Sequence, residues 1–276
     1  MISAALTSPD TGLLRPVLHL SGPKLRGSLE GLIKAAEELG GIESFVAAVK
    51  LKSELFQERL GEGRAAAIER GAFDDLIRFM PTVRRRISAL VATDAWSGTR
   101  AAMAELLQDA HQPGTGDARI AAFEGALRER ATATDGAHAR FHRDFAAELL
   151  HNVWPEHYPL MTRWVWDAKA NTGVLREIWH DPIAGDATDQ IVIDAPDTHD
   201  AFLVLREELS HFLSEQGIFR DMLWFVDLVE AHIYGGYINS QGGAWLKADF
   251  SAEGDPLEHT RRILGLDARR RPSAGG

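Results

Sequence analysis

Apolar residues recur at helical spacing through most of this chain, and this periodicity constrains the fold more than any other feature. Spacings near 3.6 residues align the apolar side chains of 42–60, and again those of 83–91, along one side of a helix. The positions are Ile42, Phe45, Val49, Phe56 and Leu60 in the first segment and Val83, Ile87, Leu90 and Val91 in the second. The pattern predicts a mostly α protein, an irregular bundle of roughly nine or ten helices.

A single convincing strand signal interrupts this helical pattern. Gln190 to Ile193 reads Gln-Ile-Val-Ile and follows a polar, turn-forming stretch. Because one short strand cannot form a sheet alone, we expect at most one short β element near 190–193.

The length of 276 residues is compatible with one large domain or two smaller ones. A loop with two glycines and a proline at 112–117 separates two segments of similar composition, about 20–111 and 117–265. We therefore expect a single helical domain over 1–276, or two tightly packed halves that meet at this loop. Residues 268–276 contain three arginines followed by Pro-Ser-Ala-Gly-Gly, a composition that predicts a flexible tail.

Composition and charge exclude several classes of protein. The chain has no cysteine, which removes disulfides, thiolate zinc sites and cysteine-ligated iron–sulfur clusters. Since it has no run of about 18 apolar residues and no secretory leader, we expect a soluble cytoplasmic protein without membrane contact. A net charge of −10 opposes nucleic acid binding, and Arg84, Arg85 and Arg86 would point in three directions from one helix.

Motifs of the common enzyme classes are also missing from the sequence. It has no glycine-rich phosphate loop of the Walker or dinucleotide type, no Gly-x-Ser-x-Gly element and no kinase motif set. No cofactor is therefore favoured, and the sequence indicates a non-catalytic role ahead of an enzymatic one.

Reactive side chains concentrate between Ala137 and Asp167, a stretch with four histidines and three tryptophans. A helical wheel for 137–153 places four polar residues on the side that also carries the apolar stripe: His138, His142, Glu148 and Asn152. His151 turns to the side of this wheel, and Glu230 occupies an inward position in a second predicted helix. Because buried polar groups are costly unless partnered, the polar row marks either a functional site or an internal hydrogen-bond network.

One hypothesis for this row is a metal centre inside the helical bundle. Imidazole and carboxylate ligands together suit iron or manganese, so the chain would be a metalloenzyme resembling an oxidase or oxygenase. The candidate ligands are His138, His142, Glu148 and Glu230. Glu148–His151 and Glu208–His211 have the Glu-x-x-His spacing of helical di-iron proteins, a resemblance limited to four residues, and the wheel places the second copy at the surface.

The other interpretation of the row is structural. In this view the polar groups hydrogen-bond one another and backbone carbonyls that Pro155 and Pro159 set free. A buried glutamate would then form an internal ion pair with Arg163, Arg176 or Arg220.

Aromatic and arginine residues between 154 and 179 support a third interpretation, a protein-binding surface. Trp, Tyr and Arg dominate the hot spots of protein interfaces. The candidate contact residues are Trp154, Tyr158, Arg163, Trp164, Trp166, Arg176 and Trp179. Our first prediction is a non-catalytic accessory or adaptor protein that docks a protein partner through this surface, and the metalloenzyme is the alternative. The sequence leaves the oligomeric state open.

Overall fold

A computed structural model describes residues 15–110, 116–130, 136–181, 191–241 and 257–268, without the side chains of 130, 136–140 and 241. These residues form ten α-helices and two short 3₁₀ helices, and no strand, which confirms the mostly α fold. None of the described helices combines the length and apolar character needed to span a bilayer.

The helices follow one another along the chain with short connections. The first half contains α1 (Gly22–Glu37), α2 (Ile42–Leu60), η1 (Arg64–Ala67), α3 (Arg70–Ile77), η2 (Ile87–Ala89) and α4 (Trp96–Leu107). The second half contains α5 (Gly116–Arg130), α6 (Gly136–Val153), α7 (Val174–Glu177), α8 (His199–Glu215), α9 (Met222–Gln241) and α11 (Glu258–Ile263).

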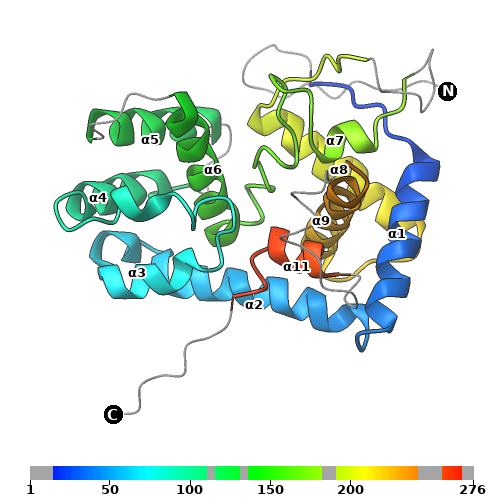
Figure 1. Ribbon diagram of the computed structural model, residues 1–276, viewed down its shortest axis with the longest axis horizontal. Coiled ribbons are helices and arrows are strands. Elements are labelled where there is room, and N and C mark those ends of the chain that lie inside the picture. Colours follow the sequence, from blue (N-terminus) through cyan, green and yellow to red (C-terminus); the bar gives the residue numbers. More distant parts are fainter. Residues whose placement is uncertain (1–14, 111–115, 131–135, 182–190, 242–256, 269–276) are drawn as a thin grey trace.

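Helix α6 lies at the centre of the molecule, between two groups of helices (Figure 1). On one side are α3, α4 and α5, and on the other are α1, α7, α8 and α9, while α2 runs beneath both groups. Buried apolar residues from α1 through the end of α11 belong to one hydrophobic core. Segments from both sides of the 112–117 loop therefore share this core.

The apolar stripe predicted for α6 is buried as expected. Phe141, Phe145 and Leu149 are almost fully inaccessible to solvent. Phe145 packs against Phe73 of α3 and Phe123 of α5, with ring centroids 6.1 and 5.3 Å apart. The polar residues on the same side of α6 are consequently held in the protein interior.

The short segment predicted as a strand is irregular where the structure describes it. Gln190 lies outside the described residues, and Ile191–Ile193 pair with a side chain in place of a neighbouring strand. Asn171 donates from Nδ2 to the Ile191 carbonyl at 2.8 Å and accepts from the Ile193 N–H at 3.1 Å. The amide side chain therefore satisfies the backbone groups that a second strand would have paired.

The prediction of a helix around 83–91 is wrong, although the apolar residues of this segment are buried. Val83, Ile87, Leu90 and Val91 face the core from a series of turns and the short η2 helix. The Thr82 N–H donates to the buried Glu148 carboxylate at 3.1 Å, outside any helical pattern. Turn spacing and helix spacing bury similar positions over so short a segment, which is why periodicity did not distinguish them.

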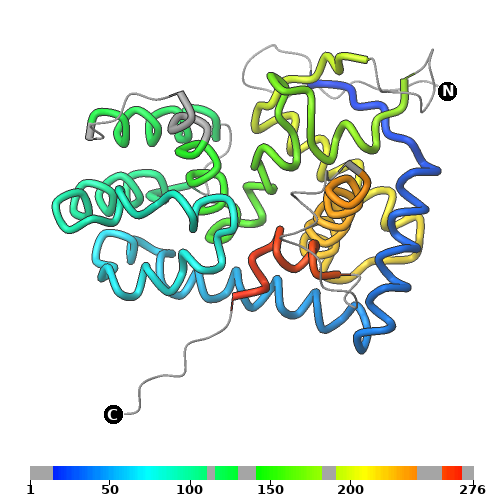
Figure 2. Tube along the Cα trace, viewed as in Figure 1, coloured from blue at the N-terminus to red at the C-terminus, as the bar shows by residue number. Residues whose placement is uncertain are grey.

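The C-terminal segment crosses the molecule between α2 and α9. Figure 2 shows residues 257–268, at the red end of the trace, lying over α2 beside α9. Gly265 has φ +73°, and a Cβ there would clash with the Phe79 carbonyl, so only glycine allows this close approach. The segment is thereby held against the turns that follow α3. Of the predicted tail, only Ala268 lies within the described residues.

Candidate functional site

The centre of the α6 polar row is Glu148, whose carboxylate is buried and partnered. Its Oε1 atom accepts hydrogen bonds from the N–H and the hydroxyl of Thr82, and its Oε2 atom lies 4.0 Å from Lys52 Nζ. Burial raises the pKa of Glu148, while Lys52 and Thr82 oppose that shift. Glu148 is buried as predicted. Its partners are Thr82 and Lys52, which the sequence did not indicate, and not the predicted arginines.

Lys52 lies on α2 and connects Glu148 to the C-terminal segment. Its Nζ atom donates to the Leu264 carbonyl at 2.9 Å. Burial lowers the pKa of Lys52, and the charges of Glu148 and Asp227 oppose this effect. One buried lysine therefore holds α2, α6 and the end of α11 together.

Two further members of the network correct and extend the helical-wheel analysis. His151, placed at the side of the wheel, is in fact buried, and its Nδ1 and Nε2 atoms lie 2.9 Å from the Tyr158 carbonyl and 3.0 Å from Asp227 Oδ2. Asn152 donates to the Glu148 carbonyl at 2.7 Å. The wheel assigned His151 incorrectly because α9 covers the flank of α6 as well as its apolar stripe.

Glu230 and Asp144 are the other buried acids of this interior. Burial raises the pKa of Glu230 well above its ordinary range, with Asp227 adding to the shift and Arg206 opposing it. Burial also raises the pKa of Asp144, to about 6, against the effect of Arg163, whose Nε atom lies 2.7 Å from Oδ2. Arg163 thus forms an internal ion pair, but with Asp144 and not with the buried glutamate that the structural interpretation predicted.

The predicted metal ligands do not converge within the described residues. No group of three His, Asp or Glu side chains there is arranged to hold a metal ion. Glu148 is engaged by Thr82 and Lys52, and His142 is buried beside Phe141 with ring centroids 5.6 Å apart. The side chain of His138 lies outside the described part of the chain.

Most rings of the predicted docking surface are in the hydrophobic core. Trp164, Trp166 and Trp179 are only 7%, 2% and 7% exposed, and Tyr158 is 1% exposed. The Tyr158 hydroxyl and the Trp166 Nε1–H donate to the carbonyls of Ala110 and Ala195, at 2.6 and 3.0 Å. The prediction of a free aromatic surface is wrong for these four residues, because their rings pack in the hydrophobic core.

The remaining three predicted contact residues are partly accessible. Trp154 is half-buried, and so are Arg163 and Arg176. Arg163 pairs with Asp144, and Arg176 donates to the Ile191 carbonyl at 2.9 Å. These two guanidinium groups therefore anchor loops of this chain.

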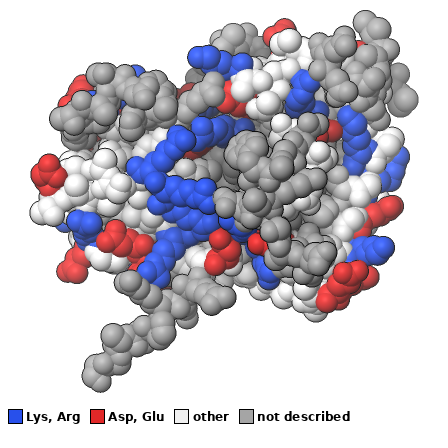
Figure 3. Space-filling model, viewed as in Figure 1, with Lys and Arg blue, Asp and Glu red and all other residues white. Residues whose placement is uncertain are grey.

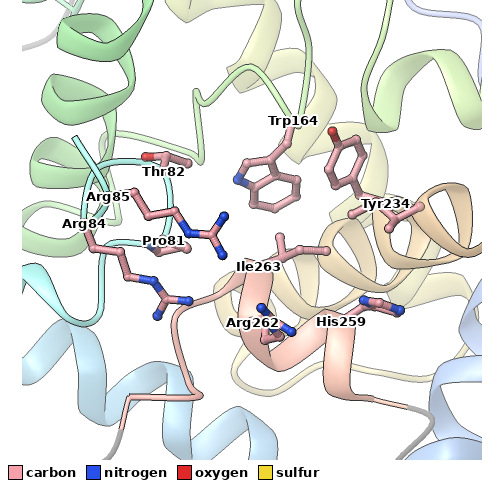
Figure 4. A pocket seen from close by; sticks show the side chains of 10 residues that line it. Pro81, Thr82, Arg84, Arg85, Trp164, Tyr234, His259, Arg262 and Ile263 are labelled. Carbon is pink, nitrogen blue, oxygen red and sulfur yellow. The ribbon is translucent and has the colours of Figure 1, made fainter. Parts of the chain in front are cut away.

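A pocket opens next to this interior, and Trp164 forms part of its wall. It has a volume of about 220 Å³ and is lined by Pro81, Thr82, Arg84, Arg85, Trp164, Tyr234, Ile238, His259, Arg262 and Ile263. Figure 4 shows Arg84 and Arg85 reaching in from the turn after α3, Arg262 from α11, and the two aromatic rings from the opposite wall. We refer to these ten residues as the basic aromatic pocket.

The three arginines of the pocket differ in their ion pairs. Arg84 binds Asp267 through two hydrogen bonds of 2.8 Å, and Arg262 lies 3.6 Å from Glu258. Arg85 is exposed and pairs with no carboxylate among the described residues. Burial lowers the pKa of His259, so the arginines carry the positive charge of the pocket near neutral pH.

The surroundings of the pocket are basic although the whole chain is acidic. Figure 3 shows Lys and Arg side chains gathered in an arc near the centre of this face, between α6 and α11. The net charge of −10 is thus distributed unevenly. A local positive field of this kind attracts anions independently of the overall charge.

The buried network and the pocket are physically connected. Thr82, in one wall, donates to Glu148, and Leu264, next to Ile263 of the other wall, accepts from Lys52. The Arg84–Asp267 pair joins the same two segments directly at the surface. The Lys52–Glu148 pair therefore fixes the two walls of the pocket relative to each other.

Among the pocket residues, the aromatic pattern of the sequence indicates Trp164 and Tyr234 as contact candidates, but it does not predict the pocket. The other lining residues are separated by up to 182 positions, from Pro81 to Ile263. Comparisons with known proteins supply no relative: no family model matches the chain, and no curated protein or solved structure shows significant similarity to it.

Proposed function

We propose that this chain is a non-catalytic accessory protein that docks a protein partner by taking an anionic side chain of that partner into the basic aromatic pocket. The observation that carries this proposal is Arg85, an exposed guanidinium at the pocket that has no described carboxylate partner. Arg84 and Arg262 join it from two segments far apart in the sequence. Arginine forks of this kind bind carboxylates and phosphates through paired hydrogen bonds.

The size of the pocket supports a side chain as the bound group. Its volume of about 220 Å³ lies below the roughly 300–1,000 Å³ of pockets for drug-sized ligands. One side chain with a charged end fills such a space, whereas a dinucleotide exceeds it. We therefore still propose a protein partner, but one that contacts the pocket arginines and not the buried tryptophans.

The buried acids and histidine support a non-catalytic role. Glu148 is engaged by Thr82 and Lys52, and His151 pairs with Asp227. Neither Glu148 nor the His151–Asp227 pair lines the pocket. Their interactions hold the pocket walls in place. The metalloenzyme alternative has no further support, since the described candidate ligands are not grouped.

Isothermal titration calorimetry at low salt tests this proposal with inorganic phosphate and with a blocked peptide that carries one glutamate. Arg85→Ala should weaken binding of both probes at least about tenfold, because a hydrogen bond to a charged group contributes about 1.5–3 kcal/mol. Arg86→Ala is the matched control, since Arg86 is the exposed neighbour outside the pocket lining. The peptide with glutamine in place of glutamate should not bind.

Equal affinities of Arg85→Ala, Arg86→Ala and the unmodified protein would overturn the proposal. Binding of phosphate that depends on Arg85, together with failure of every anionic peptide, would replace the protein partner with a small anion.

A further inference from the structure

The basic aromatic pocket has two chemically different ends. Figure 4 shows Arg84 and Arg85 entering it from the turn after α3, and Arg262 entering below them from α11. Trp164 and Tyr234 stand on the other side with ring centroids 5.8 Å apart and an interplanar angle of 37°. Ile238 and Ile263 add apolar surface to the lining. A ligand that complements both ends has an apolar body and an anionic tip.

We propose that the pocket selects an aromatic ring that carries a phosphate, presented by the protein partner as a phosphorylated tyrosine. This inference rests on the proposed function and names the side chain that the pocket takes. The ring lies against Trp164 and Tyr234, and the phosphate lies among the arginines. Aromatic rings prefer tilted or offset contacts with other rings, and an indole beside a phenol offers both a face and an edge.

The supporting structure behind Tyr234 favours a ring-binding wall. Tyr237 stacks on Tyr234 with centroids 5.7 Å apart and an angle of 27°. Burial raises the pKa of Tyr234, so its phenol stays neutral beside an anion at physiological pH. The wall therefore presents a fixed, uncharged aromatic surface to the ligand.

The basic end matches a phosphate better than a single carboxylate. Arg84 and Arg262 each share their charge with one acid of this chain, and Arg85 does not. A phosphate monoester carries about −1.5 to −2 charge at pH 7 and three acceptor oxygens, so it can be held by guanidinium groups from both walls at once. A carboxylate has two oxygens and one charge, and it leaves one of these groups unused.

Other phosphorylated ligands fit the two ends less well. Phosphoserine has no ring to place beside Trp164 and Tyr234. A mononucleotide places a ribose between its ring and its phosphate, so these two groups lie farther apart than in phosphotyrosine. Phosphotyrosine joins the ring directly to the phosphate.

Calorimetry with phenyl phosphate, inorganic phosphate and adenosine monophosphate tests the inference on the intact protein. Phenyl phosphate should bind about twofold to twelvefold tighter than inorganic phosphate, since an aromatic contact contributes about 0.5–1.5 kcal/mol. Tyr234→Leu should reduce this advantage, because the variant lacks one of the two rings of the wall. Tyr234→Phe, which keeps the ring, should retain the advantage. A peptide with phosphotyrosine should likewise exceed the same peptide with phosphoserine.

The outcomes separate this inference from the proposed function. Equal affinities for phenyl phosphate and inorganic phosphate, both dependent on Arg85, would overturn the ring preference and leave an anion pocket. Tighter binding of adenosine monophosphate than of phenyl phosphate would assign the pocket to a nucleotide. Absence of any Arg85-dependent binding would overturn both. If Tyr234→Leu does not fold, the ligand series and Tyr234→Phe still decide the ring preference.

Discussion

The buried row of α6 and the basic aromatic pocket are neighbours, but they are assembled in opposite ways. The row comes from one helix, and its residues follow a helical repeat that is visible in the sequence. The pocket comes from the turn after α3, the loop with Trp164, α9 and α11. The row has its charges paired inside the protein, whereas the pocket leaves Arg85 exposed to solvent. A concentration of reactive residues on one helix can therefore be the support of a site formed elsewhere.

The largest expected effect comes from breaking the buried ion pair that supports the pocket. Lys52→Met leaves Glu148 without its charged partner in the interior and should lower the free energy of unfolding by about 3–5 kcal/mol. The double variant Lys52→Met, Glu148→Leu should recover much of this loss because no unpaired charge remains. Urea denaturation followed by circular dichroism measures both values.

Lys50→Met is the matched control for this prediction. Lys50 is also on α2, but its pair with Asp221 is exposed, with an N–O distance of 3.8 Å. Exposed pairs contribute about 0–1 kcal/mol, so this variant should stay close to the unmodified protein. A Lys52→Met loss as small as that of Lys50→Met would contradict the supporting role of the row.

The next largest effect concerns Glu230 and pH. Because its folded pKa is raised well above its ordinary value of 4.5, Glu230 stabilises the fold fully below that value, and this contribution falls as pH rises. Glu230→Gln cannot ionise, so its stability does not fall in this way. The variant should therefore become more stable than the unmodified protein as pH rises. The gain should be about 1.4 kcal/mol per pH unit above 4.5, as long as Glu230 stays protonated in the folded protein.

Unfolding curves from pH 5 to pH 8 check this dependence. Glu208→Gln, at an exposed position of α8, is the control and should follow the unmodified protein at every pH. A constant difference between Glu230→Gln and the unmodified protein would contradict a protonated Glu230 in the folded state.

The smallest expected effect sharpens the contrast between paired and unpaired arginines. Asp267→Asn releases Arg84 from its carboxylate at the pocket rim, where both side chains are partly exposed, so stability should change by less than about 1 kcal/mol. Phosphate should bind more tightly, by about twofold to fivefold, since the freed charge interacts with the ligand at the screened strength of a partly exposed pair. Calorimetry measures the change, and weaker binding would show that Asp267 positions Arg84 for the anion.

Local patterns predicted the parts of the molecule that depend on local sequence. The predicted burial of Phe141, Phe145 and Leu149 was correct because one continuous helix packs one defined side against the core. The burial of Glu148 and Glu230 was also correct for this reason. The partners of these buried groups could not be predicted. Lys52 and Asp227 come from other helices, and no local pattern assigns them to Glu148 or His151.

The pocket could not be predicted for a related reason. Arg84 and Arg85 belong to a segment whose spacing suggested a helix, and the Thr82–Glu148 hydrogen bonds hold that segment in turns instead. The close contact between Gly265 and Phe79 holds the C-terminal segment in the position from which Arg262 lines the pocket. Net charge described the chain as acidic because it averages over faces of opposite sign.

Crystals grown with tungstate, a heavy analogue of phosphate, test most directly whether the basic aromatic pocket is an anion site. An anomalous difference map should show tungsten within hydrogen-bonding reach of Arg85 and Arg262, and the peak should vanish in Arg85→Ala and persist in Arg86→Ala. Tungstate bound only elsewhere on the basic face, or a pocket peak of equal height in Arg85→Ala, would contradict the assignment of this pocket.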